Sequence, residues 1–184
     1  MQTINTTRFG NVEINDEHLI HFKDGMIGFG RYKKYVLVES GSLPLLLWLQ
    51  STDDADIAFP VIEPYFFKKD FKVAMNEADK HSLAFTEGDR IKFFVVMTIP
   101  ENMTQMTVNM KAPIALDINQ GTGAQIILQD KNLQVRTPAH ESFSRAVSNF
   151  ATEPFTQVAP ETQEDSWTAV NVRSSISQGF SATV

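Results

Sequence analysis

Short apolar segments separated by turn-forming residues dominate the first 128 positions of the chain. Apolar and polar residues alternate in some of these segments and run continuously in others, and both patterns are typical of β-strands. Glycine, asparagine, aspartate or proline separates most of them, as expected for tight turns. The pattern predicts strands at 3–9, 12–14, 19–22, 35–39, 45–51, 58–63, 91–99, 114–118 and 126–128.

Many short strands at close spacing favour an antiparallel sandwich or barrel over an α/β fold. We therefore expect a mainly β protein in which residues 1–136 form one compact, antiparallel, barrel-like domain. One short helix is expected inside it, after Asn76, because asparagine is a good N-cap for the residues that follow. The glycine-rich segment 23–30 predicts a shaped loop that anchors apolar side chains.

The segment 91–99 predicts a strand with apolar side chains on both faces. Ile91, Phe93, Val95, Met97 and Ile99 alternate onto one face, and Phe94 and Val96 onto the other. A strand of this kind is covered on both sides of its sheet. We expect it to be a central strand of the domain.

The composition changes near Thr137, and residues 137–184 are expected to form a C-terminal extension. Pro138 suits the first turn of a helix over 138–151. Three apolar residues then recur at helical spacing and predict a stripe that docks on the β domain or on a partner: Phe143, Val147 and Phe150. For the distal part, the Ser, Thr and Pro content makes a disordered tail the competing expectation.

The segment 47–64 joins a dense apolar strand, an acidic turn and a second strand. Apolar residues throughout 45–49 suit either a strand buried on two sides or a surface kept for a partner. Trp48 in particular fits the core or the anchor of an interface. The acidic residues between the strands predict a solvated turn, and they are Asp53, Asp54 and Asp56.

The chain has 16 Lys and Arg against 22 Asp and Glu, a net charge of −6, and no cysteine. This balance argues against binding to nucleic acid, which requires clustered basic residues, and favours a basic partner protein. The lack of cysteine excludes disulfides and thiolate chemistry and fits a cytoplasmic protein. Because the apolar runs are short, neither an export signal nor a membrane segment is predicted.

Candidate catalytic, metal-binding and cofactor-binding residues form no recognisable pattern. His18 and His21 lie three positions apart, which in a strand places them on opposite faces. The acidic run lacks the glycine and distal glutamate of a calcium loop, and no helix follows the glycine-rich segment to bind phosphate. Ser51 has no nucleophile elbow. We therefore predict no enzymatic activity, no metal and no cofactor.

Three groups of residues resemble the bacterial flagellar assembly factor family known as FliW. The first is the loop Phe22-x-x-Gly25-x-x-Gly28-Phe29. The second is Leu49-Gln50-Ser51 with Asp54, Phe59 and Pro64, and the third is Thr107, Asn109, Ala112, Pro113, Ile114 and Gln125. The resemblance runs from about Phe9 to Leu128. The chain departs from the family at Lys23 and Gly30, where a proline and an acidic residue are usual.

The resemblance implies a compact, barrel-like cytoplasmic protein without enzymatic activity. It implies binding to flagellin and to the carbon storage regulator CsrA, a small RNA-binding translational repressor, which would relieve repression of flagellin synthesis. A monomer with no direct contact to nucleic acid or membrane is expected. The alternative is a small-molecule-binding or hydrolytic β-barrel, which a deep pocket with convergent polar groups would favour.

Four polar residues beside apolar strands are the candidate protein-binding residues: Gln50, Ser51, Asp54 and Asn109. Their side chains could fix the register of a contact with a partner. The alternative is that they hold turns together through hydrogen bonds to nearby backbone groups.

Overall fold

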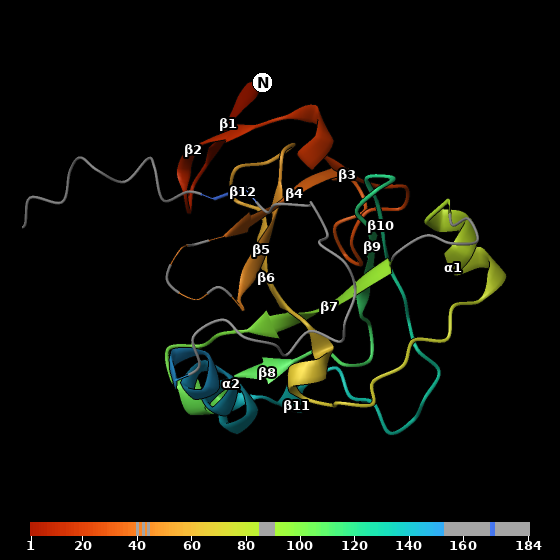
Figure 1. Cartoon of the computed structure of the whole chain (residues 1–184). Coiled ribbons are helices and arrows are strands. Elements are labelled where there is room, and N and C mark those ends of the chain that lie inside the picture. The colour runs from red at the N-terminus through yellow and green to blue at the C-terminus, as the bar shows by residue number, and fades with distance from the viewer. Residues whose placement is uncertain (40, 42, 44, 85–90, 153–169, 172–184) are drawn as a thin grey trace, which may run out of the picture.

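The computed structural model describes residues 1–39, 41, 43, 45–84, 91–152 and 170–171 (Figure 1). The strands of this part are β1 (Gln2–Thr6), β2 (Gly10–Ile14), β3 (Ile20–Phe22), β4 (Lys34–Glu39), β5 (Leu47–Ser51), β6 (Ala58–Ile62), β7 (Ile91–Thr98), β8 (Thr107–Val108), β9 (Ile114–Asp117), β10 (Thr122–Gln125), β11 (Thr137–Pro138) and β12 (Val170–Asn171). Its helices are α1 (Glu77–Ser82) and α2 (His140–Thr152), with short 3-10 turns η1 (Asp16–His18), η2 (Pro64–Phe66) and η3 (Met103–Gln105).

Seven strands close into a barrel in the order β7-β6-β5-β4-β3-β10-β9, and β9 pairs back with β7. Strands β3 and β10 pair in parallel, and we call this pair the parallel joint. The other neighbouring strands of the ring pair antiparallel. Strand directions can alternate all the way round only when the number of strands is even, so a ring of seven needs a parallel joint. The mainly β, barrel-like fold is confirmed, and this joint corrects the expectation of a wholly antiparallel sheet.

The parallel joint depends on glycine. Gly123 pairs with Phe22 across it, and the His21 amide donates to the Gly121 carbonyl at 2.8 Å. A Cβ on Gly123 would lie 2.5 Å from the Phe22 ring and 2.9 Å from Leu116. The aromatic ring therefore fills the space that a side chain at position 123 would take.

The barrel interior is an apolar core to which six of its strands contribute. Its largest fully buried members are the aromatic residues Phe22, Tyr35 and Phe94 together with Leu49, Ile114 and Leu116. Phe22 and Tyr35 pack edge to face, with ring centroids 5.1 Å apart. Because side chains fill the interior, the barrel is a packed core.

A second apolar cluster covers the outer face of β6, β7 and β9. As predicted, β7 is buried on both faces, since Phe94 and Val96 point to the interior while Val95 and Met97 join the outer cluster. The strand ends at Thr98, and Ile99 is 36% exposed, so the predicted alternation stops one residue early. Helix α2 packs on this cluster, at the bottom of the view in Figure 1.

The β1–β2 hairpin covers the outer face of β4 and β5 (Figure 1). Its Val12 and Ile14 pack with Val36 and Val38, and Trp48 lies at the edge of this cluster. The Arg8 guanidinium stands 3.9 Å from the centroid of the Trp48 ring. Trp48 is thus half-buried under the hairpin, while its neighbours Leu47 and Leu49 face the interior.

Both predicted helices are present. The Asn76 side chain caps α1 by accepting from the Asp79 amide at 2.9 Å, as predicted. Helix α2 begins at His140 and not at Pro138, because Thr137–Pro138 pairs with β8 as a short strand. Of the predicted stripe, Phe143 is buried and Val147 packs on the outer cluster, which confirms docking on the β domain, whereas Phe150 is 42% exposed.

Two turns are displaced from their predicted positions. The first hairpin turns at residues 7–9, ahead of positions 10–11 between the strands predicted at 3–9 and 12–14. The strand predicted at 126–128 is replaced by β10, because Thr122 and Gly123 pair with β3 and so belong to the barrel. The tail beyond residue 152, apart from β12, lies outside the described residues. Within the described part, neither helix has the length and apolar character needed to cross a membrane.

We predict that Gly123→Ala destabilises the protein by about 1–3 kcal/mol, because overpacking forces Phe22 or the backbone of the parallel joint to move. Urea unfolding measures the change. Gly30→Ala is the matched control, since a Cβ there meets a single carbonyl oxygen at 3.2 Å. Equal losses in the two variants would contradict the assignment of the joint as the tight point of the barrel.

We predict that alkaline destabilisation depends on Tyr35. Burial, and then the nearby Asp53 and Tyr32, raises the pKa of Tyr35 from 10.0 to about 12. A raised folded pKa means that the contribution of this phenol to stability is complete below pH 10 and is lost as the pH rises toward 12. Urea unfolding of the wild type and Tyr35→Phe between pH 8 and about pH 12 should show the wild type losing stability relative to the variant. A constant difference would contradict the shift.

Candidate functional site

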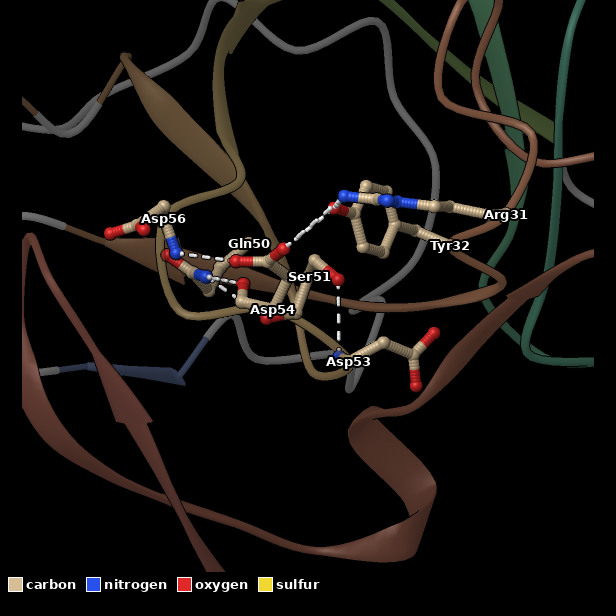
Figure 2. Close-up of polar contacts among 7 residues, drawn as sticks. All are labelled: Arg31, Tyr32, Gln50, Ser51, Asp53, Asp54 and Asp56. Atoms are coloured by element: carbon tan, nitrogen blue, oxygen red, sulfur yellow. Dashed lines mark hydrogen bonds and ion pairs between the residues drawn. The ribbon is translucent and has the colours of Figure 1, made fainter.

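The acidic turn, residues 52–57, joins β5 to β6 and holds the three carboxylates predicted to be solvated (Figure 2). Its base is closed by the Ser51 amide, which donates to the Ile57 carbonyl at 2.8 Å. The Thr52 amide donates to the Lys34 carbonyl at 2.9 Å and so ties the turn to β4. Asp53 and Asp56 are exposed, and Asp54 is half-buried.

Gln50 is fully buried beneath this turn. Its side-chain amide nitrogen lies 2.9 Å from the Ser51 carbonyl and 3.1 Å from the Ile57 carbonyl. The carbonyls of Asp54 and Ala55 are slightly further away, at 3.3 and 3.4 Å. Buried carbonyls need a donor, and a single primary amide serves several here.

Ser51 and Asp53 hold the side of the acidic turn that faces the start of β4. Ser51 is buried, and its hydroxyl oxygen accepts from the Asp53 amide at 3.1 Å. The Asp53 carboxylate accepts from the Lys33 and Lys34 amides at 3.0 and 3.2 Å. One carboxylate oxygen thus bridges the acidic turn and the start of β4.

Asp54 connects the turn to the loop that precedes β4 (Figure 2). Its carboxylate accepts from the Tyr32 hydroxyl at 2.6 Å and from the Asp56 amide at 3.1 Å. The Arg31 guanidinium lies 3.9 Å away and also contacts the Tyr32 hydroxyl. The Tyr32 hydrogen bond, and then the Asp56 amide and the Arg31 charge, lower the pKa of Asp54. The Asp54 carboxylate therefore stays ionised to lower pH than an ordinary aspartate.

The far side of the turn is held by the β1–β2 hairpin. The Thr7 amide donates to the Ala55 carbonyl at 3.1 Å, and the Thr7 hydroxyl donates to the Asp56 carboxylate. The turn is therefore held from β4, from the loop before it and from the hairpin. Such a loop presents its exposed carboxylates in a fixed arrangement.

Asn109 stabilises a different turn. Its side-chain oxygen accepts from the Ala112 backbone amide at 3.0 Å. Its backbone amide donates to the Val96 carbonyl on β7 at 2.9 Å. Val96 pairs with Val61, and Val61 pairs with Leu47, at the opposite end of β5 from Gln50. The fold thus brings Gln50, Ser51 and Asp54 together and leaves Asn109 apart from them.

Three residues that complete the acidic turn were not predicted: Thr7, Arg31 and Tyr32. They reach it from segments more than 20 residues away along the chain. Their residue types carry no signal of this role, because hydroxyls and guanidinium groups are common in surface loops. Only the pairing of the strands places them beside Asp54 and Asp56.

A pocket lies elsewhere, beside the glycine loop at residues 23–30. It has a volume of about 230 Å³ and is lined by that loop, by α1 and by β10. The Ile27 amide donates to Gln125 at 3.0 Å, and Gln125 in turn donates to the Ala112 carbonyl at 3.1 Å. The Gln125 side chain is thus engaged in holding the loop. In the described residues no group of acidic or histidine side chains is arranged to hold a metal ion.

The chain matches the sequence model of the FliW protein family over residues 3–139. It is 38% identical over 144 residues to the flagellar assembly factor FliW of Bdellovibrio bacteriovorus, covering 78% of this chain and 82% of that protein. It is 36% identical over 148 residues to the FliW of Caldanaerobacter subterraneus, covering 79% of this chain and 98% of that protein.

The fold also matches a crystal structure of the flagellar assembly factor FliW, with a TM-score of 0.69 and 24% identity. The match covers 74% of this chain and 96% of the solved one. At this identity it establishes the fold, and the sequence comparisons establish the family, whose members are not enzymes. The closed barrel, the glycine loop and the acidic turn all fall within the matched residues, and this chain belongs to the FliW family of flagellar assembly factors.

Proposed function

We propose that this assembly factor binds flagellin and a CsrA-type translational regulator in the cytoplasm, acting as a monomer, and so relieves repression of flagellin synthesis. Family membership supports a role in flagellar assembly. The net charge of −6 supports a basic partner such as an RNA-binding protein and opposes direct binding to RNA.

The acidic turn is the observation that carries this proposal. Asp53 and Asp56 are exposed and fixed by hydrogen bonds to two neighbouring elements, so a partner meets carboxylates that are already ordered. The exposed Arg31 guanidinium beside Asp54 adds a cation and makes the surface selective for a partner with both signs of charge. Pre-ordered charges at the rim of an interface mainly accelerate association.

The four candidate residues would act by shaping this surface. Gln50 and Ser51 are buried, so their part in binding is to hold the acidic turn in its conformation. Asp54 positions Arg31 at the rim. Asn109 would shape a second contact at the turn 109–112, apart from the acidic turn.

We predict that replacing both exposed carboxylates, as Asp53→Asn and Asp56→Asn together, weakens binding of the regulator about tenfold and reduces its dependence on salt. Asparagine keeps an oxygen for the hydrogen bonds that hold the turn, so the loss reports charge. Calorimetry with purified regulator and flagellin at two salt concentrations measures it. The control, Glu13→Gln with Glu101→Gln, changes two exposed acidic residues outside the turn.

A wild-type protein that gives no heat with either partner, or that binds RNA tightly, would overturn the proposed function. If the control pair weakened binding as much as the Asp53 and Asp56 pair, the effect would come from net charge and not from the acidic turn.

We predict that Gln50→Leu destabilises the protein by about 1–3 kcal/mol, because the Ser51 carbonyl loses the buried side-chain amide that donates to it and the Ile57 carbonyl keeps only the Ser51 amide. Urea unfolding measures stability, and calorimetry on the folded variant measures partner binding, which should fall as the turn loosens. Gln129→Leu is the control, since Gln129 is exposed and makes one hydrogen bond, of 3.3 Å, to the Ile127 carbonyl. Unchanged affinity in folded Gln50→Leu would show that the turn is not part of the interface.

A further inference from the structure

Strand β4 pairs unequally along its two edges. On one edge, β5 pairs with it from Tyr35 to Glu39. On the other edge, β3 pairs only with Lys34 and Tyr35. The remainder of that edge lies next to a strand of the C-terminal extension, β12, in which Val170 is opposite Val38 and Asn171 is opposite Glu39. The pairing is parallel, and Figure 1 shows β12 beside β4 and the β1–β2 hairpin.

The direction of the backbone groups of β4 follows from its neighbours. The Lys34 carbonyl accepts from Thr52 next to β5, and the Lys33 carbonyl accepts from Phe22 in β3. Because alternate residues of a strand bond to opposite sides, Leu37 and Glu39 direct their amides and carbonyls toward the edge that β12 occupies. In a parallel pair with Val170 opposite Val38, the amide and carbonyl of Val170 face β4 and lie between Leu37 and Glu39.

The origin of the two strands differs. The edge belongs to the part of the chain that matches the family, residues 3–139, whereas β12 comes from the extension beyond it. An unpaired strand edge is a template for other extended chains, and proteins commonly cover it. Here the chain covers it with a segment of its own, through a pairing only two residues long.

We propose that the edge of β4 at Leu37–Glu39 is a strand-addition site whose occupant is the chain's own strand β12, which binds reversibly and excludes other extended chains from this edge. So short a pairing supplies few hydrogen bonds, each of about 0.5–1.5 kcal/mol. A covalently linked segment compensates through an effective concentration on the order of millimolar. The resident strand therefore blocks weak ligands and yields to stronger ones. This inference does not depend on the proposed partners.

Proline at position 170 tests the resident strand in the full-length chain. Val170→Pro removes the amide that faces β4, and Asn171→Pro is the matched control because the amide at 171 points away from β4. Amide hydrogen exchange by NMR is the measurement. The Glu39 amide should exchange at least about tenfold faster in Val170→Pro, while Asn171→Pro stays near the wild type. Unchanged exchange at Glu39 in Val170→Pro would overturn the proposal.

A peptide in trans tests the site itself. The probe is a synthetic peptide of residues 165–176, DSWTAVNVRSSI, with a scrambled peptide as control. Full-length Val170→Pro should bind it with a Kd below about 0.1 mM and shift the Glu39 resonance, because a linked strand at an effective concentration of about 1 mM fills its site to about nine-tenths only when its intrinsic Kd is about tenfold lower. The wild type should bind it at least about tenfold more weakly, since its site is filled. Equal binding to both proteins, or binding to neither, would overturn the proposal.

Discussion

Closure of the barrel between β3 and β10 is the constraint on which the rest of the structure depends. Seven strands cannot alternate in direction around a ring, so one joint has to be parallel, and a parallel joint cannot be made by a simple hairpin. The chain makes it between segments about 100 residues apart, with Gly123 leaving room for the Phe22 ring. A side chain at this position would displace the aromatic core that the other strands share.

The closed barrel also positions the acidic turn. Because β4 lies between β3 and β5, the loop that precedes β4 brings Arg31 and Tyr32 beside Asp54. The outer face of β4 and β5 receives the β1–β2 hairpin, whose Thr7 then reaches Asp56. The barrel interior is filled by apolar side chains, so the proposed recognition of partners falls to the surface loops and strand edges. A packed scaffold with pre-ordered loops suits a protein that binds other proteins.

The extension beyond the family region has two places on this scaffold. Helix α2 seals the outer cluster next to β7 through Phe143, and β12 returns to the edge of β4. The first contact buries apolar side chains and contributes to stability, whereas the second is a backbone pairing of two residues, which we propose is exchangeable. Within one extension, helix α2 is therefore a structural element, whereas β12 is the proposed exchangeable one.

The sequence alone determined most of the strands, the two-faced burial of β7, the Asn76 cap and the buried part of the α2 stripe, Phe143 and Val147. These features depend on local periodicity and on residue propensity, which the chain carries position by position. Residue motifs such as Leu49-Gln50-Ser51 also pointed to the family. Only the tertiary structure decided the parallel joint, the start of β10 at Thr122, the loss of Pro138 to β11 and the partners of Asp54. Each of these is a pairing between distant segments, whose energy appears only when the chain has closed and is not present in any local pattern.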